Sequence, residues 1–190
     1  MSTIRLDVIN RSATHGRLRL GNLVIPCRLG RSGIKSLKRE GDGATPAGRW
    51  MLRRVLFRPD RIARPQTRLP VAAIALLDGW CDAPSDRNYN RPVRLPYPAS
   101  HESLWRDDRL YDVVVVLSHN ERPRRRYHGS AVFLHMADPT GRPTAGCVAV
   151  RPRDMGRLLA LCGRGASIEI GPTATRKSLT RPGHRSPRRR

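Results

Sequence analysis

His135 and Cys147 are of the residue types that together perform nucleophilic acyl chemistry. His135 ends an apolar run at 131–134, and Cys147 follows Gly146 at the start of a second apolar run. The segment 138–143 between them is dense in turn formers, which predicts a hairpin that brings the two strand ends together. An imidazole beside a thiol stabilises the thiolate and later protonates a leaving amine. The pattern therefore indicates a nucleophile and its base.

Gly146 suggests how such a site stabilises negative charge. It lacks a side chain, so a carbonyl can approach the backbone, and the N–H groups of Gly146 and Cys147 are candidate oxyanion donors, worth roughly 3 to 4 kcal/mol each in acyl transfer. Two alternatives stay open. His135 and Cys147 are also compatible with a polar strand end and a small buried residue. His119 and His128 are rival bases.

The resemblance of three motifs to a known family gives this pair more weight. The segment 144–147 reads Thr-Ala-Gly-Cys, His135 precedes it, and 45–50 reads Thr-Pro-Ala-Gly-Arg-Trp far upstream. In this order the motifs resemble the L,D-transpeptidase catalytic domain of the YkuD family, over about residues 17–171. The resemblance is closest to a stand-alone bacterial branch, through the motifs at 129–135 and 143–147.

The resemblance implies a fold and an activity. The expected fold is mainly β (α+β), a mixed β-sheet sandwich with one or two short helices. The expected reaction is acyl transfer on peptidoglycan stem peptides, in which Cys147 attacks and His135 protonates the departing D-alanine. An amine then takes the acyl group from the thioester. Hydrolysis of the same bonds, as in an L,D-carboxypeptidase or endopeptidase, is the close alternative, and no metal or cofactor is needed.

The chain departs from the family pattern at three places. Met136 follows His135 where glycine is usual, the loop from His135 to Cys147 is short, and Ala149 stands where an arginine is common. The last departure puts in doubt the substrate contact that such an arginine makes.

Substrate contacts are expected both near the pair and in a long polar segment. Residues 78–112 are rich in Pro, Asn, Asp and aromatic residues, which favours a lid over the cleft rather than disorder. His101 and Glu102 lie within this segment, although 100–103 can also be read as a helix start. The candidate substrate-binding residues are Thr144, Ala145, Phe133, Trp80, His101 and Glu102.

The remaining patterns predict strands, one helix and a tail. The helix begins near Arg151-Pro152, with an apolar stripe through Met155, Leu158, Leu159 and Cys162. The run 113–117 predicts a central strand. Other strands are expected at 4–10, 17–20, 23–27, 48–58, 71–77 and 167–170.

The chain divides into a catalytic domain at 1–171 and a basic tail at 172–190. The tail holds seven Lys or Arg residues and no acid, so we expect it to be disordered. Its charge suits tethering to an anionic cell-wall polymer or to the inner membrane surface, and a tail without a partner is equally compatible.

The charge of the chain is strongly positive. With 37 Lys and Arg against 15 Asp and Glu, the formal charge is +22, and only three of the cations are lysines. Such a surface favours polyanions, although a genome-wide arginine bias explains it equally well. A non-enzymatic polyanion-binding protein is therefore the rival interpretation. The spread of the cations and the absence of nucleic-acid-binding signatures argue against a specific nucleic-acid partner.

The four cysteines and the N-terminal residues give information on the cellular compartment of the protein. Cys27, Cys81, Cys147 and Cys162 form no Cys-x-x-Cys pair, which disfavours a structural metal, while a Cys27–Cys81 disulfide stays open. The resemblance implies the cell envelope. The first residues lack the features of a signal peptide, so we expect another export route, a different start or an intracellular role. The oligomeric state is left undetermined.

Overall fold

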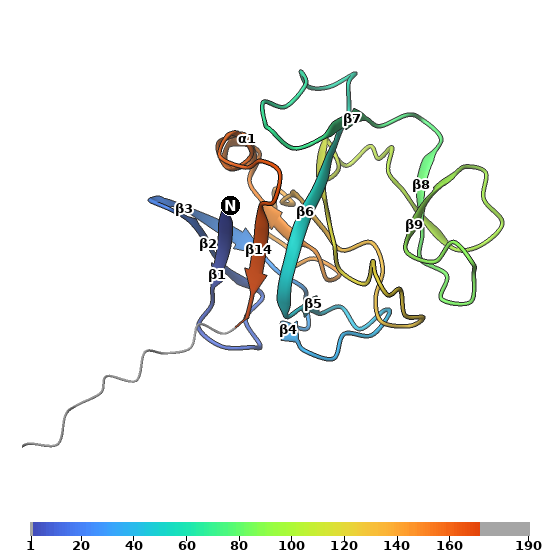
Figure 1. The fold of residues 1–190 in the computed structure, drawn as a ribbon, viewed down its shortest axis with the longest axis horizontal. Helices are drawn as coiled ribbons and strands as arrows, with labels where there is room; N and C mark the ends of the chain where they lie inside the picture. Colours follow the sequence, from blue (N-terminus) through green and yellow to red (C-terminus); the bar gives the residue numbers. More distant parts are fainter. Residues whose placement is uncertain (1, 172–190) are drawn as a thin grey trace, which may run out of the picture.

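The computed structural model describes residues 2–171, which are mostly β-strand with one short α-helix (Figure 1). The expected division at 171 and the basic tail at 172–190 fall at or outside the limit of the described residues. Among residues 2–171 no helix combines the length and the apolar character that crossing a membrane requires. The elements are, in chain order, β1 (Thr3–Asp7), β2 (His15–Leu20), β3 (Leu23–Arg28), β4 (Ile34–Lys35), β5 (Thr45–Pro46), β6 (Gly48–Phe57), β7 (Val71–Ala73), β8 (Asp78–Cys81), β9 (Arg91–Arg94), β10 (His101–Ser103), β11 (Val113–Leu117), β12 (Phe133–Met136), β13 (Val148–Val150), α1 (Pro152–Ala160) and β14 (Ser167–Ile170).

The main sheet is mixed and closes on itself. Its order is β11-β12-β13-β3-β2-β1-β14-β6-β7, and β11 also pairs with β6, so only β7 lies outside the ring. Three of its pairs are parallel, β1–β14, β12–β13 and β6–β7. Closure gives most of its strands two neighbours each, which leaves few free edges. The expectation of a mainly β fold with a mixed sheet and a short helix is confirmed.

The core has two parts, one on each side of β11. Val113, Val115 and Leu117 belong to the larger cluster, which α1 closes with Met155, Leu158 and Leu159. Val114 and Val116 belong to a second cluster. A strand buried on both faces reads as a continuous apolar run rather than an alternating one. The predictions of a central strand at 113–117 and of a helix after Arg151 are thereby confirmed.

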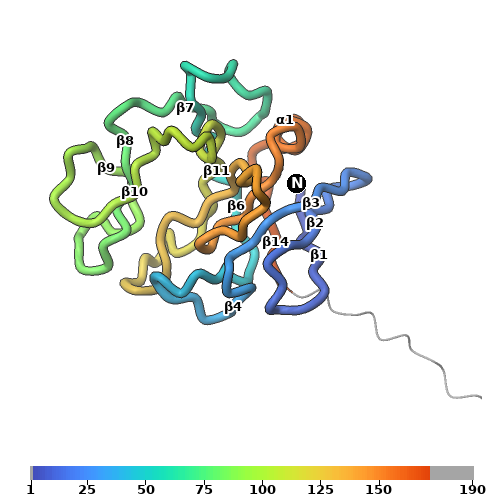
Figure 2. The backbone as a smooth tube through the Cα atoms, turned by 180° about the vertical axis from the view of Figure 1, so that it is seen from behind, coloured from blue at the N-terminus to red at the C-terminus, as the bar shows by residue number. Residues whose placement is uncertain are grey.

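The segment 78–112 forms a separate small sheet beside the ring. Its strands are ordered β10-β8-β9, and Figures 1 and 2 show them to one side of the main sheet, away from β1–β3. We call residues 78–112 the side sheet. It packs against the ring through the second cluster, to which it contributes Trp80, Leu104 and Tyr111. Residues 101–103 form a strand, so the helix-start interpretation of 100–103 was wrong.

The sequence left open whether Cys27 and Cys81 form a disulfide, and in the structure both are free thiols. Two other expectations were wrong. The predicted buried strand at 71–77 shortens to β7, and Leu76 and Leu77 are exposed because the chain turns there towards the side sheet. The second is the predicted hairpin, because β12 and β13 run parallel. Parallel neighbours need a crossover, and residues 137–147 provide it.

Candidate active site

A pocket of about 820 Å³ brings together three parts of the chain that are distant in sequence. Figure 2 shows two of them, the side sheet and the segment around β4, next to the part of the chain that runs from β12 to β13. The first wall comes from residues 31–41, the second from the side sheet, and the third from residues 130–147. Its principal polar and reactive lining residues are Arg31, Lys38, Glu40, Asp82, His101, Glu102, Arg106, Tyr111, Ser130, His135, Thr144 and Cys147.

The strand register puts His135 and Cys147 on one face of the sheet. Leu134 pairs with Val148, and both belong to the larger core cluster. Successive side chains of a strand point to opposite faces, so His135 and Cys147, each one position away, point to the other face. Both line the pocket. The structure thus brings the predicted pair together through parallel strands.

The side chain of His135 is oriented by the backbone of the next residue. Its Nδ1–H donates to the carbonyl oxygen of Met136 at 2.7 Å, which leaves Nε2 as an unprotonated acceptor. The ring of Tyr111 lies edge-on at 5.3 Å. Burial lowers the pKa of His135 to about 4, and the nearby Arg106 guanidinium acts in the same direction. The imidazole is therefore neutral at pH 7.

Cys147 rests as a neutral thiol. Its S–H donates to the carbonyl oxygen of Ala131 at 3.2 Å, and the N–H of Phe133 donates to Sγ at 3.3 Å. Burial raises the pKa of the thiol to about 12, and the negative charge of Glu102 adds to the rise. The sequence suggested a thiolate held by an imidazole. The resting site instead holds both groups uncharged, because burial disfavours either charge.

Gly146 has a conformation that other residues adopt with strain. Its φ is +142°, and a Cβ there would lie 2.9 Å from the carbonyl oxygen of Ala44. Its N–H already donates to Thr144 Oγ1 at 3.1 Å, so the oxyanion role suggested for it requires that Thr144 turn away. Thr144 Oγ1 also donates to the carbonyl oxygen of Cys147 at 2.7 Å. Thr144 therefore stabilises the backbone of the turn that carries Cys147.

The early Thr-Pro motif lies against this turn. Thr45 is buried and its hydroxyl donates to the carbonyl oxygen of Cys147 at 3.4 Å, while it accepts from the N–H of Gly30 at 2.8 Å. The resemblance implied that residues 45–50 lie beside the site, and these contacts place Thr45 there.

The candidate substrate-binding residues divide into two groups. Thr144, Ala145, His101 and Glu102 line the pocket. Trp80 and Phe133 do not. Phe133 is fully buried and Trp80 is 6% exposed, and their rings meet edge to face at 5.2 Å. Because Trp80 and Phe133 are buried and do not line the pocket, they are not part of its surface.

The rival bases lie elsewhere. His119 is buried against Trp50, with ring centroids 4.7 Å apart, and its Nε2–H donates to the carbonyl oxygen of His128 at 3.0 Å. His128 is exposed. Neither lines the pocket that holds Cys147.

Sequence reasoning missed several pocket residues, chiefly Tyr111, Arg106 and Lys38. Tyr111 donates its hydroxyl to Glu102 Oε1 at 2.6 Å, and burial raises its pKa. Lys38 is buried and is paired with Asp42. A buried lysine implies a partner, and the acid four residues later was the available signal.

Ala149, at the position where the family pattern often has an arginine, lies outside the active-site pocket. It is buried and lines a separate pocket of about 830 Å³ on the other side of the segment 137–141. Its partner across the sheet is Arg28, which also lines that pocket.

Comparison with known proteins gives one match, to a family model. Residues 7–170 match the family model YkuD, described as the L,D-transpeptidase catalytic domain. No curated protein and no solved structure matched the chain.

Proposed function

Because this chain belongs to the YkuD family of L,D-transpeptidase catalytic domains, we propose that it performs cysteine-dependent acyl transfer on peptidoglycan stem peptides. Cys147 is the nucleophile and His135 is the general base and acid. The observation that carries the proposal is the shared face of β12 and β13, which turns both side chains into one pocket.

The neutral pair sets the order of events. The thiol turns its proton from the Ala131 carbonyl to Nε2 of His135 as Sγ attacks the scissile carbonyl. An S–C bond forms, and the C–N bond to the departing D-alanine breaks as His135 returns the proton to its nitrogen. The Met136 carbonyl stabilises the transient imidazolium, because it accepts from Nδ1–H.

The thioester then passes to an amine. His135 removes a proton from the attacking amine, the new C–N bond forms, and the S–C bond breaks with return of the proton to Sγ. Water in place of the amine gives hydrolysis by the same residues. The identity of the acceptor therefore decides between transpeptidase and carboxypeptidase products.

The test is incubation with a disaccharide tetrapeptide, followed by mass analysis of the products. Wild-type protein should release D-alanine and form cross-linked dimers, whereas loss of D-alanine with tripeptide as the only other product would identify a hydrolase. Cys147→Ala should form neither product. Unchanged turnover in Cys147→Ala, with the protein still folded, would refute the role of Cys147.

A further inference from the structure

Glu102 is an acid with spare binding capacity in the active-site pocket of a strongly basic protein. Its side chain, on β10, lines the same pocket as Cys147 and is 27% exposed. Oε1 accepts from the Tyr111 hydroxyl at 2.6 Å. Within residues 2–171 we find no hydrogen-bond partner for Oε2. One oxygen is therefore held in place while the other is available to a ligand.

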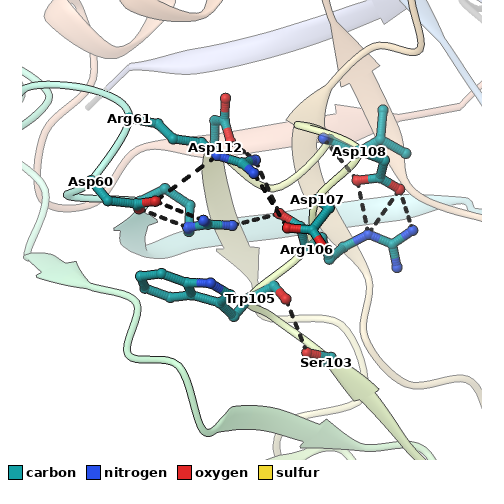
Figure 3. A network of polar contacts seen from close by, with 10 residues as sticks. Asp60, Arg61, Ser103, Trp105, Arg106, Asp107, Asp108 and Asp112 are labelled. Atoms are coloured by element: carbon teal, nitrogen blue, oxygen red, sulfur yellow. Dashed lines mark hydrogen bonds and ion pairs between the residues drawn. The ribbon is translucent and has the colours of Figure 1, made fainter.

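Arg106, the nearest cation, is already committed to another acid. Figure 3 shows its guanidinium paired with Asp108, to which Nε donates at 3.1 Å. The same group lies 5.0 Å from the centre of the Tyr111 ring. Its closest approach to Glu102 is 3.6 Å, beyond hydrogen-bond distance. Arg106 thus offsets the charge of Glu102 only in part.

A second carboxylate adds to the imbalance. Asp82 follows β8, the strand next to β10, and lines the same pocket. Its Oδ1 is buried and has no hydrogen-bond partner among the residues the structure describes. Because this oxygen is buried, Asp82 acts on the pocket through its negative charge rather than through a direct contact with a ligand. The negative charge of Asp82 raises the pKa of Glu102 further, beyond the effect of burial.

From this geometry we propose that Glu102, with Asp82 beside it, binds a free ammonium group on the substrate residue that contributes the scissile carbonyl, and that Cys147 reacts fastest when this group is bound. An ammonium suits the site because it has three donors for carboxylate oxygens. The described residues hold no group of three or more His, Cys, Asp or Glu side chains around a common point, which makes a metal ion the poorer fit.

The link to reactivity is electrostatic. Glu102 opposes ionisation of Cys147, whereas Lys38 favours it. The other charged or titratable groups that line this pocket are Arg31, Glu40, Asp82, His101, Arg106, Asp108, Tyr111, His135, Asp138 and Arg142. A bound cation offsets the charge of Glu102 and so lowers the pKa of the thiol. The inference rests on the proposed function, since it takes Cys147 as the nucleophile.

The experiment compares two activated esters that differ only in the side-chain ammonium group, the nitrophenyl esters of Nα-acetyl-lysine and Nα-acetyl-norleucine. In each, the S–C bond forms, the C–O bond to nitrophenolate breaks, and the thiol proton leaves through His135. Nitrophenolate release gives the acylation rate, and intact mass gives the adduct. Wild type should prefer the lysine ester by roughly 10-fold to 100-fold, the range of a charged hydrogen bond.

Glu102→Gln should remove this preference by slowing the reaction of the lysine ester. Neutral iodoacetamide should also alkylate Cys147 faster in this variant, which a merely structural defect does not produce. Asp82→Asn should reduce the preference in part. Glu169→Gln, an exposed acid on β14 that is absent from the pocket, is the matched control and should behave as wild type.

Four results would overturn the proposal. A preference that survives Glu102→Gln, or equal slowing of both esters, would remove Glu102 from substrate recognition. If the two esters acylate Cys147 of the wild type at equal rates, this inference alone is overturned. Failure of both esters to acylate Cys147 would overturn the proposed function, and this inference with it.

Discussion

The Cys147–His135 pair is uncharged at rest because of the places that the two side chains occupy. Cys147 packs against the second core cluster and His135 is buried beside Tyr111. A low-dielectric surrounding disfavours a thiolate and an imidazolium alike. In the reaction that we propose, the proton must therefore move during the attack, so the reaction depends on the free base form of His135.

The first prediction, at the scale of single residues, concerns the pH dependence of Cys147 acylation. Protonation of His135 removes the base, and its pKa is lowered to about 4, so the rate of Cys147 acylation should stay level from pH 8 to about 5 and halve near pH 4. An ordinary histidine, with a pKa of about 6.5, would begin to lose activity above pH 6. The pH profile of acylation by a carbapenem or an activated ester measures this.

Two histidine variants distinguish the titration of His135 from that of the Cys147 thiol. In His135→Ala the rate should be low and should keep rising with pH well beyond 9, because burial raises the pKa of Cys147 to about 12. His128→Ala, which changes an exposed histidine outside the pocket, should follow the wild-type profile. A wild-type profile with its midpoint near 6.5 would contradict the buried, neutral pair.

The second prediction concerns the backbone of the nucleophile turn. Gly146→Ala should lower the free energy of unfolding by about 1 to 3 kcal/mol, since its φ of +142° disfavours a side chain and a Cβ meets the carbonyl oxygen of Ala44. Acylation should fall with it. The control is Gly156→Ala on α1, where a Cβ has no neighbour within 4 Å; it should stabilise by about 0.5 to 1 kcal/mol. Urea unfolding measures both, and a stabilised Gly146→Ala would refute the strained turn.

At the scale of elements, the side sheet is a wall of the active site that the second core cluster holds in place. Trp80, Leu104 and Tyr111 pack against β11 and Phe133 on one side, while His101 and Glu102 line the pocket on the other. The lid expected at 78–112 is in this structure a packed wall. Its position depends on this apolar contact and on hydrogen bonds such as those of Asn90 to the backbone of His119 and Ala131.

The third prediction tests that dependence. Leu104→Ala removes a buried side chain of the second cluster and should cost about 2 to 5 kcal/mol. It should also make residues 82–100 more sensitive to proteolysis and slow acylation of Cys147 by more than tenfold, because the wall loses its contact with the ring. Leu158→Ala, in the larger cluster on α1, should cost a similar amount without slowing acylation in the folded protein. Equal effects of the two variants on acylation would show that the wall does not position the site.

At the scale of the whole molecule, we expect the net charge and the chemistry proposed for the pocket to act separately. The net charge is +22, of which residues 172–190 supply +7, yet the active-site pocket contains five carboxylates. Surface charge acts on polyanions at long range and is screened by salt, whereas the pocket groups act at contact distance.

The fourth prediction rests on this separation. Removal of residues 172–190 should leave the melting temperature and turnover of small substrates unchanged. Binding to intact sacculi or to an anionic polymer should weaken at low salt, and the difference should disappear at high salt. Co-sedimentation at two salt concentrations measures it. Binding that is the same with and without these residues would assign the affinity to the surface of residues 2–171.

Several features were determined by the sequence alone, because local pattern is enough for them. The valine run at 113–117 required burial on both faces, and the proline start and apolar stripe after Arg151 required a helix on the core. The order of His135 and the Thr-Ala-Gly-Cys motif along the chain pointed to the two residues that we propose as base and nucleophile. The apolar run at 71–77 misled because hydrophobicity by itself does not distinguish a buried strand from an exposed turn.

Only the tertiary structure decided how the site is assembled. Turn formers at 138–143 show that the chain bends, but strand pairing is a long-range choice, and β12 and β13 pair in parallel rather than as a hairpin. The charge states of Cys147 and His135 depend on what buries them, and the sequence does not contain that information. The same holds for Tyr111 and Glu102, nine residues apart along the chain, whose hydrogen bond forms because the side sheet folds back over β11.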